Sequence, residues 1–214
     1  MSAEPRAAAR LRAEEDYVAM IAHELRSPLN GIKAWAHVLR NSVAVDAAAE
    51  RAIDGILVGV AEQVRLVQGL ADISSARAGT LELTRHPLVL AEALAEAAHE
   101  AMAAAQAKSV RLAIDNTDSD ATVNADGARV RELLTQALLY AIRYCPAGST
   151  VRATASRDRD MACVEVADDG APAAARHCTI GLALAQELAA LHGGNVRVEG
   201  GDREVRIRVR LPRT

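Results

Sequence analysis

The residue with the clearest chemical potential is His23, which lies on a predicted helix in the run Ala22 to Asn30. Near neutral pH an imidazole presents an unprotonated nitrogen that can attack an electrophilic phosphorus. Ser27 follows four residues later and shares the same helix face, where its hydroxyl can position water to hydrolyse an acyl phosphate. Pro28 supplies no backbone N–H and should bend the helix just beyond the histidine. These residues predict phosphoryl chemistry at His23.

Two long helices must hold this histidine in place. From about residue 10 to residue 78, apolar side chains recur every seven positions, and in this register His23 falls at a solvent-facing f position. The turn-forming run 41–46 separates the helices, which we expect to form an antiparallel hairpin. A hairpin leaves one apolar face open, so we predict a homodimer built as a four-helix bundle. The register is set by Val18, Leu25, Ile32, Leu39, Ile53, Val60 and Val67.

The pattern changes near residue 80, after which short strands and helices alternate. The predicted fold class is therefore α+β, with a helical hairpin over residues 1–80 and an α/β sandwich over 81–214. In the sandwich we expect helices against one face of a mixed sheet. The strands are predicted at 88–90, 110–115, 121–124, 150–156, 162–167, 196–199 and 204–211, and the helices at 91–107, 126–144 and 180–191.

Composition narrows the function classes. The formal net charge of −3 offers no basic footprint for nucleic acid, and aromatic residues, at 2% of the chain, are too few for base stacking. Three cysteines without a CxxC pair argue against a disulfide framework or a zinc site, and the other histidines lack metal-ligand spacing. No segment has the ~18 uncharged apolar residues that span a membrane. We expect a cytoplasmic protein with no metal site, no nucleic-acid partner and no membrane partner.

The run from Ala22 to Asn30 closely resembles the phosphoacceptor motif of two-component histidine kinases. The resemblance implies that His23 accepts the phosphoryl group and that Glu24 is its acid/base partner, which takes or orients the imidazole proton. It also implies that Arg26 and Asn30 contact a docked partner protein.

The second half of the chain resembles the ATP-binding domain of the same kinases, the Bergerat-type sandwich. Residues 133–146 stand where that family has its N box, 166–172 at its first glycine box and 181–184 at its second. The resemblance implies that Asp168, Gly170 and Gly181 form the nucleotide-binding site, with Asp168 hydrogen-bonded to the adenine amino group.

Several positions depart from the family pattern. The N-box asparagine that ligates Mg²⁺ is replaced by Tyr140, whose neutral phenol is a poor ligand for a hard cation. Pro172 replaces a glycine of the first box and removes a backbone donor. Only residues 173–180 separate the two glycine boxes, which is too short for the usual lid over ATP. We therefore predict a vestigial nucleotide site.

The leading hypothesis is a histidine phosphotransferase that relays a phosphoryl group through His23 to or from the aspartate of a response regulator receiver domain. It binds no cofactor strongly, and the receiver supplies Mg²⁺. An upstream hybrid histidine kinase is a further candidate partner. One alternative is an ATP-dependent cytosolic histidine kinase that autophosphorylates His23, and only then is ATP a cofactor. A second alternative is a non-enzymatic regulator that binds a receiver.

Overall fold

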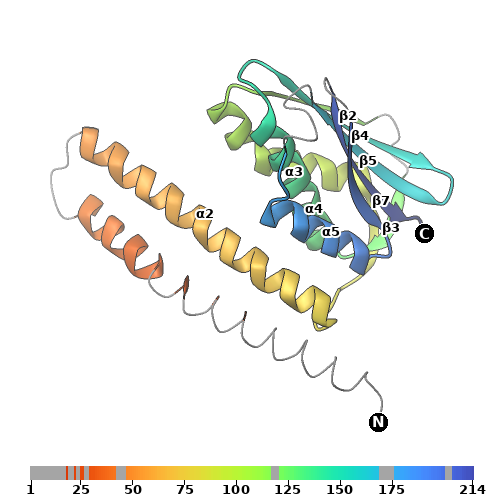
Figure 1. Ribbon diagram of the computed structural model, residues 1–214, viewed down its shortest axis with the longest axis horizontal. Helices are drawn as coiled ribbons and strands as arrows, with labels where there is room; N and C mark the ends of the chain where they lie inside the picture. The colour runs from red at the N-terminus through yellow and green to blue at the C-terminus, as the bar shows by residue number, and fades with distance from the viewer. Residues whose placement is uncertain are drawn as a thin grey trace, which may run out of the picture. The chain divides into compact units, whose positions relative to one another are not determined.

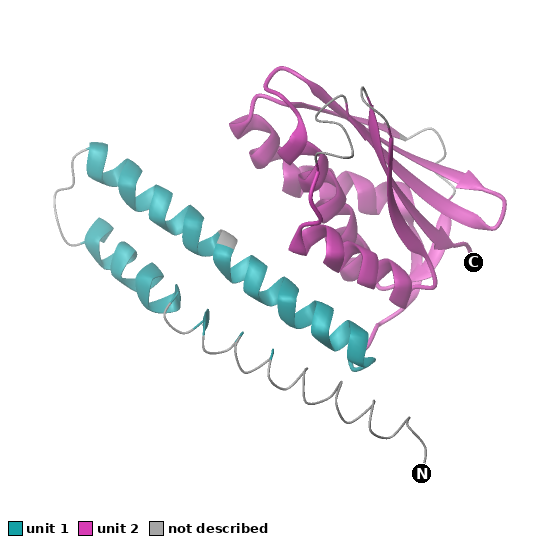
Figure 2. Ribbon diagram, in the orientation of Figure 1, with its two compact units in different colours: residues 1–81 teal, residues 82–214 magenta. Residues whose placement is uncertain are grey.

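The computed structural model describes residues 18, 22, 25, 26, 29–41, 47–116, 121–168, 176–200 and 204–214, with the backbone alone at 62 and 116. The chain divides into two compact units, Met1–Leu81 and Glu82–Thr214, which Figure 2 colours separately. Each unit has its own architecture and is described by itself.

The first unit is a helical hairpin. Residues 29–41 are helical, and α2 spans Ala47–Ala78 (Figure 1). Arg26 donates a hydrogen bond to Gln68 (2.6 Å), and Arg40 pairs with Asp54 (3.5 Å). Later residues of the first helix thus contact earlier residues of α2. The two helices are therefore antiparallel, as predicted from the sequence.

The predicted seam residues Ile53 and Val60 of α2 are buried, but in the first helix the face that packs inside the hairpin differs from the predicted seam. Small or medium apolar residues spaced by seven, Ala22, Leu29 and Ala36, are at most 8% exposed. The predicted seam residues of the same helix remain about half exposed in a single chain, at 47% for Leu25, 47% for Ile32 and 52% for Leu39. The seven-residue period is thus correct, but the intrachain contact lies on a neighbouring stripe of the helix.

The second unit is built on a five-stranded mixed sheet in the order β2-β4-β5-β7-β6 (Figure 1). The pair β2 and β4 is parallel, and the other neighbours are antiparallel. A separate antiparallel pair joins β1 and β3. The strands are β1 His86–Val89, β2 Arg111–Asn116, β3 Thr122–Ala125, β4 Thr150–Asp158, β5 Met161–Asp168, β6 Asn195–Gly200 and β7 Val205–Pro212.

Three helices cover one face of this sheet: α3 (Leu90–Ala107), α4 (Gly127–Tyr144) and α5 (Ile180–Leu191). The central helix α4 packs against α3 and α5 and contacts β4, β5 and β7. Every second residue of β5 and β7 is buried, as expected for strands with one covered face. The core consists mainly of Ala, Leu, Val and Ile side chains, with Tyr140 and Cys145 among them. The predicted α+β sandwich is therefore confirmed.

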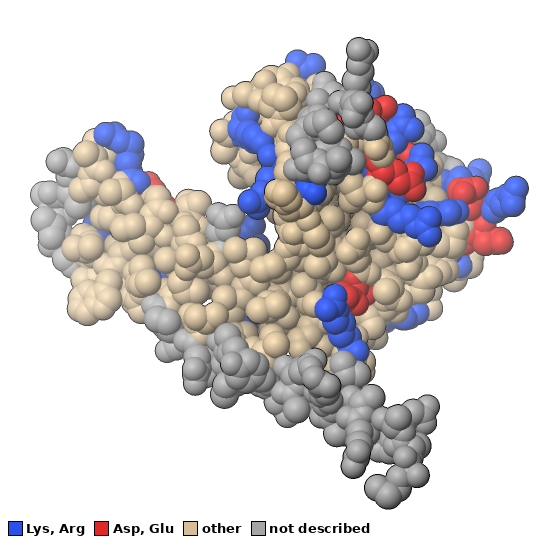
Figure 3. All heavy atoms as spheres, viewed as in Figure 1, with Lys and Arg blue, Asp and Glu red and all other residues tan. Residues whose placement is uncertain are grey.

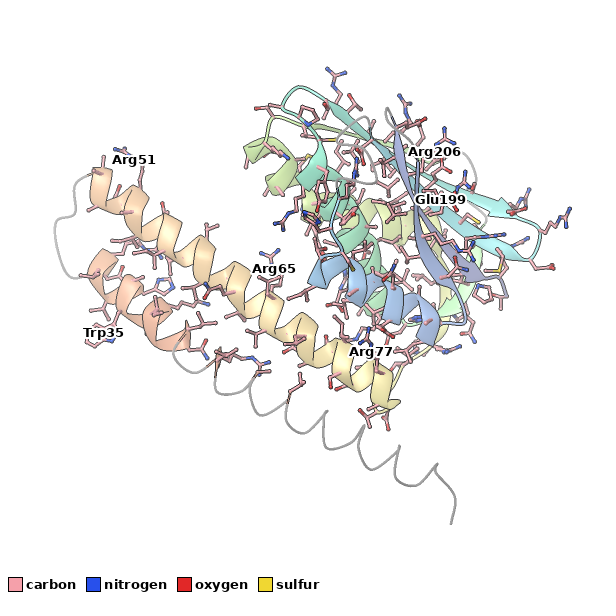
Figure 4. All side chains as sticks on the ribbon, in the orientation of Figure 1. Trp35, Arg51, Arg65, Arg77, Glu199 and Arg206 are labelled. Carbon is pink, nitrogen blue, oxygen red and sulfur yellow. The ribbon has the colours of Figure 1, made fainter. Side chains whose placement is uncertain are left out.

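The opposite face of the sheet is charged and internally paired. Arg208 on β7 lies between Glu165 on β5 and Glu199 on β6, at 2.8 Å from each carboxylate. Arg206, labelled in Figure 4 beside Glu199, also pairs with Glu165 (3.5 Å). Opposite charges on neighbouring strands keep this open face polar.

A polar junction connects the start of α4 to the end of α5. The carboxylate of Asp126 caps α4 by accepting from the backbone N–H of Arg129 (3.1 Å), and it also accepts from that of Thr84 (3.0 Å). Burial acts to raise the pKa of Asp126, but these hydrogen bonds outweigh it and lower the pKa. His192, at the C-cap of α5, accepts from the Asp126 N–H at Nε2 (3.1 Å), and its Nδ1 lies 2.7 Å from the Leu188 carbonyl.

Candidate functional site

The predicted phosphoacceptor residues His23, Glu24 and Ser27 lie outside the described residues, as does the bend expected at Pro28. Two of their neighbours are described. Asn30 is helical and exposed, so its amide is accessible on the surface of the hairpin.

Arg26 is held within its own chain. It is half-buried, and its guanidinium donates to the Gln68 side chain, which in turn donates to the buried carboxylate of Asp72 (2.8 Å). This chain of hydrogen bonds ties the first helix to α2 and orients Arg26 along the hairpin. The structure therefore gives Arg26 a structural contact in addition to the partner contact that the resemblance implies.

The second site lies at the end of β5, where Asp168 is 2% exposed. Gly170 and Pro172, with the rest of residues 169–175, lie outside the described part of the chain. Arg176 follows them and is also buried. Its Nη1 donates to one carboxylate oxygen of Asp168 at 2.8 Å, and its Nη2 donates to the other. The carboxylate that the resemblance assigns to adenine is therefore bound at both oxygens by the chain's own guanidinium.

One stripe of α4 faces this pair. Gln136, Tyr140 and Tyr144 are spaced by four residues and so share a helix face. The guanidinium carbon of Arg176 lies 5.1 Å from the centre of the Tyr144 ring, within the range of a cation–π contact. The Tyr144 ring in turn packs against Tyr140, with their centres 5.0 Å apart. The two tyrosines thus pack against each other and against Arg176.

The Tyr140 side chain does not provide a metal ligand. It is 4% exposed, and burial raises the pKa of its phenol. The hydroxyl therefore stays neutral at physiological pH, and its ring fills the position where the family has a metal-binding asparagine. A neutral phenol lacks the charge and the oxygen type that Mg²⁺ prefers.

Gly181 lies in the first turn of α5, which Thr179 caps by accepting from the Leu182 N–H (3.1 Å). A Cβ atom placed on Gly181 would lie 2.0 Å from Oε1 of Gln136. The glutamine amide therefore rests directly against this glycine. In a phosphate-binding helix start, that space must be open to the ligand. In the described arrangement, Arg176 occupies the Asp168 carboxylate, Tyr140 offers no good ligand for Mg²⁺, and the Gln136 amide fills the space beside Gly181.

Sequence reasoning missed the role of Arg176. The signal was present, since Arg176 is the sole arginine or lysine between the two glycine boxes. A buried aspartate requires a counter-charge, and Arg176 was the nearest cation after it in the sequence. The residue that lies against Gly181 is Gln136 of α4.

Among the described residues, no helix is long and apolar enough to cross a membrane. No group of three or more His, Cys, Asp or Glu side chains in this part of the chain is arranged to hold a metal ion.

Two family models match the chain. Residues 13–79 match the His Kinase A (phospho-acceptor) domain, and residues 125–214 match the histidine kinase-, DNA gyrase B- and HSP90-like ATPase. Together they cover most of the hairpin and most of the sandwich.

Curated relatives agree with these matches. An uncharacterized sensor-like histidine kinase of Rhizobium meliloti is 29% identical over 218 residues, which cover 90% of this chain and 41% of the relative. The sensor protein DivL of Caulobacter vibrioides is 25% identical, covering 88% of this chain and 26% of its own length. The chain thus spans less than half the length of these relatives.

Solved structures show the same fold. Full-length ShkA, crystallised with AMPPNP, superposes with a TM-score of 0.75 at 25% identity, covering 93% of this chain and 46% of that protein. The histidine kinase AdeS of Acinetobacter baumannii superposes at 0.65 and 15% identity, covering 90% of this chain and 98% of that one. A phosphoacceptor-type hairpin followed by an ATPase-type sandwich defines a histidine kinase core. The chain belongs to the two-component histidine kinase family.

Proposed function

We propose that this chain is a histidine phosphotransferase, which relays a phosphoryl group between His23 and the aspartate of a response regulator receiver domain. One observation carries the proposal. Tyr140, neutral and 4% exposed, occupies the N-box position at which the family places its metal-binding asparagine. A kinase needs Mg²⁺ beside the phosphates of ATP, whereas a relay that draws on a phosphorylated receiver needs no nucleotide site of its own.

The proposed step is a direct transfer from oxygen to nitrogen. The unprotonated imidazole nitrogen of His23 attacks the phosphorus of the receiver's aspartyl phosphate, so an N–P bond forms while the acyl O–P bond breaks. The aspartate leaves as a carboxylate, and Glu24 takes or orients the proton on the other ring nitrogen. Delivery to a second receiver is the reverse reaction. Mg²⁺ bound by the receiver offsets the charge on the phosphoryl oxygens.

A second copy of the chain is the partner proposed for the hairpin. The half-exposed stripe of Leu25, Ile32 and Leu39 continues at Trp35, which is 70% exposed and points away from α2 (Figure 4). The visible face of the hairpin is largely uncharged (Figure 3). Pairing of two hairpins into a four-helix bundle would cover this stripe.

A receiver domain is the second proposed partner. The histidine kinase ThkA, crystallised in complex with the response regulator protein TrrA, has this fold with a TM-score of 0.65 at 18% identity. The exposed Asn30 lies seven residues after His23, so both positions fall on the same face in the predicted helical register.

Phosphotransfer from a labelled receiver tests the proposal. A receiver carrying a ³²P-aspartyl phosphate is incubated with the wild-type chain, with His23→Ala and with His37→Ala as a control on the same helix. We expect label on the wild type and on the control, and none on His23→Ala. Label from γ-³²P-ATP on wild type, absent from His23→Ala, would contradict the proposal and establish a kinase.

The ATP-dependent kinase is the second candidate. It is favoured by the ATPase family match over residues 125–214 and by the retention of Asp168. The ATP-labelling arm decides between the two. If every receiver of a panel binds without transferring label, the chain instead acts as a receiver-binding regulator.

A further inference from the structure

The Asp168 and Arg176 side chains form a closed pair inside the second unit. Both side chains are fully shielded from solvent, at 0% exposure, and the guanidinium engages both carboxylate oxygens. Burying an ion pair of this kind is costly, because both charges must be stripped of water. We infer that Arg176 is an internal occupant of the adenine position and that it excludes nucleotide from this domain.

The chemistry of the pair supports this assignment. Adenine offers a carboxylate an in-plane N–H of its amino group and offers an aromatic side chain a flat face. Arg176 presents the same features, since its planar guanidinium donates edge-on to Asp168 and lies over the Tyr144 ring at 5.1 Å. The guanidinium also carries a full positive charge, so it binds the carboxylate more strongly than a neutral heterocycle can.

The backbone around Arg176 is held so that the side chain stays in place. The Tyr144 hydroxyl accepts from the His177 N–H (2.9 Å) and donates to the His177 carbonyl (3.2 Å). Two residues further on, Thr179 begins α5 as its N-cap. The residues that directly follow Arg176 are therefore fixed by contacts with α4 and by the start of α5.

Because Arg176 covers the carboxylate without replacing it, substitution of Arg176 should allow nucleotide to bind. Asp168 is retained, and the aromatic wall of Tyr144 remains, so removal of the guanidinium would leave a buried acceptor beside a flat surface. This inference is independent of phosphotransfer by His23, because it concerns nucleotide binding alone and is measured without a receiver.

Binding of TNP-ADP to the full chain, measured by fluorescence in EDTA, tests the inference. We expect weak binding to the wild type and at least tenfold tighter binding to Arg176→Ala. Arg197→Ala, which removes an exposed arginine on β6, is the matched control and should bind like the wild type. Adding Asp168→Asn to Arg176→Ala should abolish the gain. Equal affinity of Arg176→Ala and wild type would overturn the inference.

Methylguanidinium provides a second readout. At millimolar concentration it should raise the melting temperature of Arg176→Ala and compete with TNP-ADP, with methylammonium at equal ionic strength as control. If Arg176→Ala does not fold, Arg176→Gln keeps a shorter, uncharged polar side chain and should also bind TNP-ADP more tightly. Folded variants that gain no affinity and show no methylguanidinium effect would refute an internal occupant.

Discussion

Removal of one partner from the Asp168–Arg176 pair should strongly destabilise the second unit. The substitution Arg176→Met keeps an unbranched apolar stem but leaves the Asp168 charge without its guanidinium. Because both side chains are 0% exposed, solvent cannot replace the lost partner. Breaking a buried pair in this way costs about 3–5 kcal/mol. With a urea slope of about 2 kcal/mol per molar, the midpoint should fall by roughly 1.5–2.5 M.

The matched double variant separates burial from charge. Asp168→Leu with Arg176→Met replaces both charges by apolar groups, which in buried sites is about neutral or stabilising. We therefore expect the double variant to be more stable than either single variant.

Urea unfolding of the full chain can follow the two units separately. The single tryptophan, Trp35, lies in the hairpin, whereas two of the three tyrosines, Tyr140 and Tyr144, lie in the second unit. Near-UV circular dichroism at the tyrosine bands should show the loss, while Trp35 fluorescence should not shift. A cost below about 1 kcal/mol, the value typical of an exposed pair, would refute the burial argument.

Three further outcomes follow from the second unit. Burial lowers the pKa of His192 below its usual 6.5 in the folded protein. The contribution of the neutral imidazole to the free energy of unfolding should therefore be complete above about pH 6.5. It should fall with decreasing pH, by at most about 1.4 kcal/mol per pH unit, until the pKa of the folded state is reached. Urea midpoints at pH 7.5 and 5.5 should differ less in His192→Gln than in His99→Gln. Lys108→Ala should cost about 1–2 kcal/mol in urea unfolding, because the ammonium caps α4 at the carbonyls of residues 142 (3.0 Å) and 143. Gly194→Ala should cost about 1–3 kcal/mol, because its Cβ would lie 2.0 Å from the Arg210 carbonyl oxygen. Gly55→Ala should not destabilise the chain, because a Cβ there would meet open space beside its helix.

The sandwich was predictable because its local signals agree with its tertiary environment. The helix predicted at 180–191 is α5, bounded by Thr179 as N-cap and by Gly193, whose φ of 76° an L-residue rarely adopts. The strands alternate in burial as they alternate in polarity. Periodicity and turn chemistry are local properties, so a single sequence carries them.

The hairpin seam and the closed pair were harder to predict. Ala22 and Ala36 pack inside the hairpin, but alanine contributes little to a hydrophobic pattern beside Leu25 and Ile32, so the bulky stripe dominated the interpretation. Small residues permit close approach of two helices, which only the structure reveals. The pairing of Arg176 with Asp168 joins the end of β5 to the residues that precede α5, and no periodic signal in the sequence encodes such a tertiary contact.

Tyr140 belongs to the packed core of the second unit as well as to the predicted N box. Leu133, Leu134 and Leu138 of α4 are 0% exposed and Tyr140 is 4% exposed, and Leu133 and Tyr140, seven residues apart, share one face of the helix. The Tyr140 ring also packs against Tyr144, with their centres 5.0 Å apart. A substitution at Tyr140 therefore changes core packing together with the chemistry of the site.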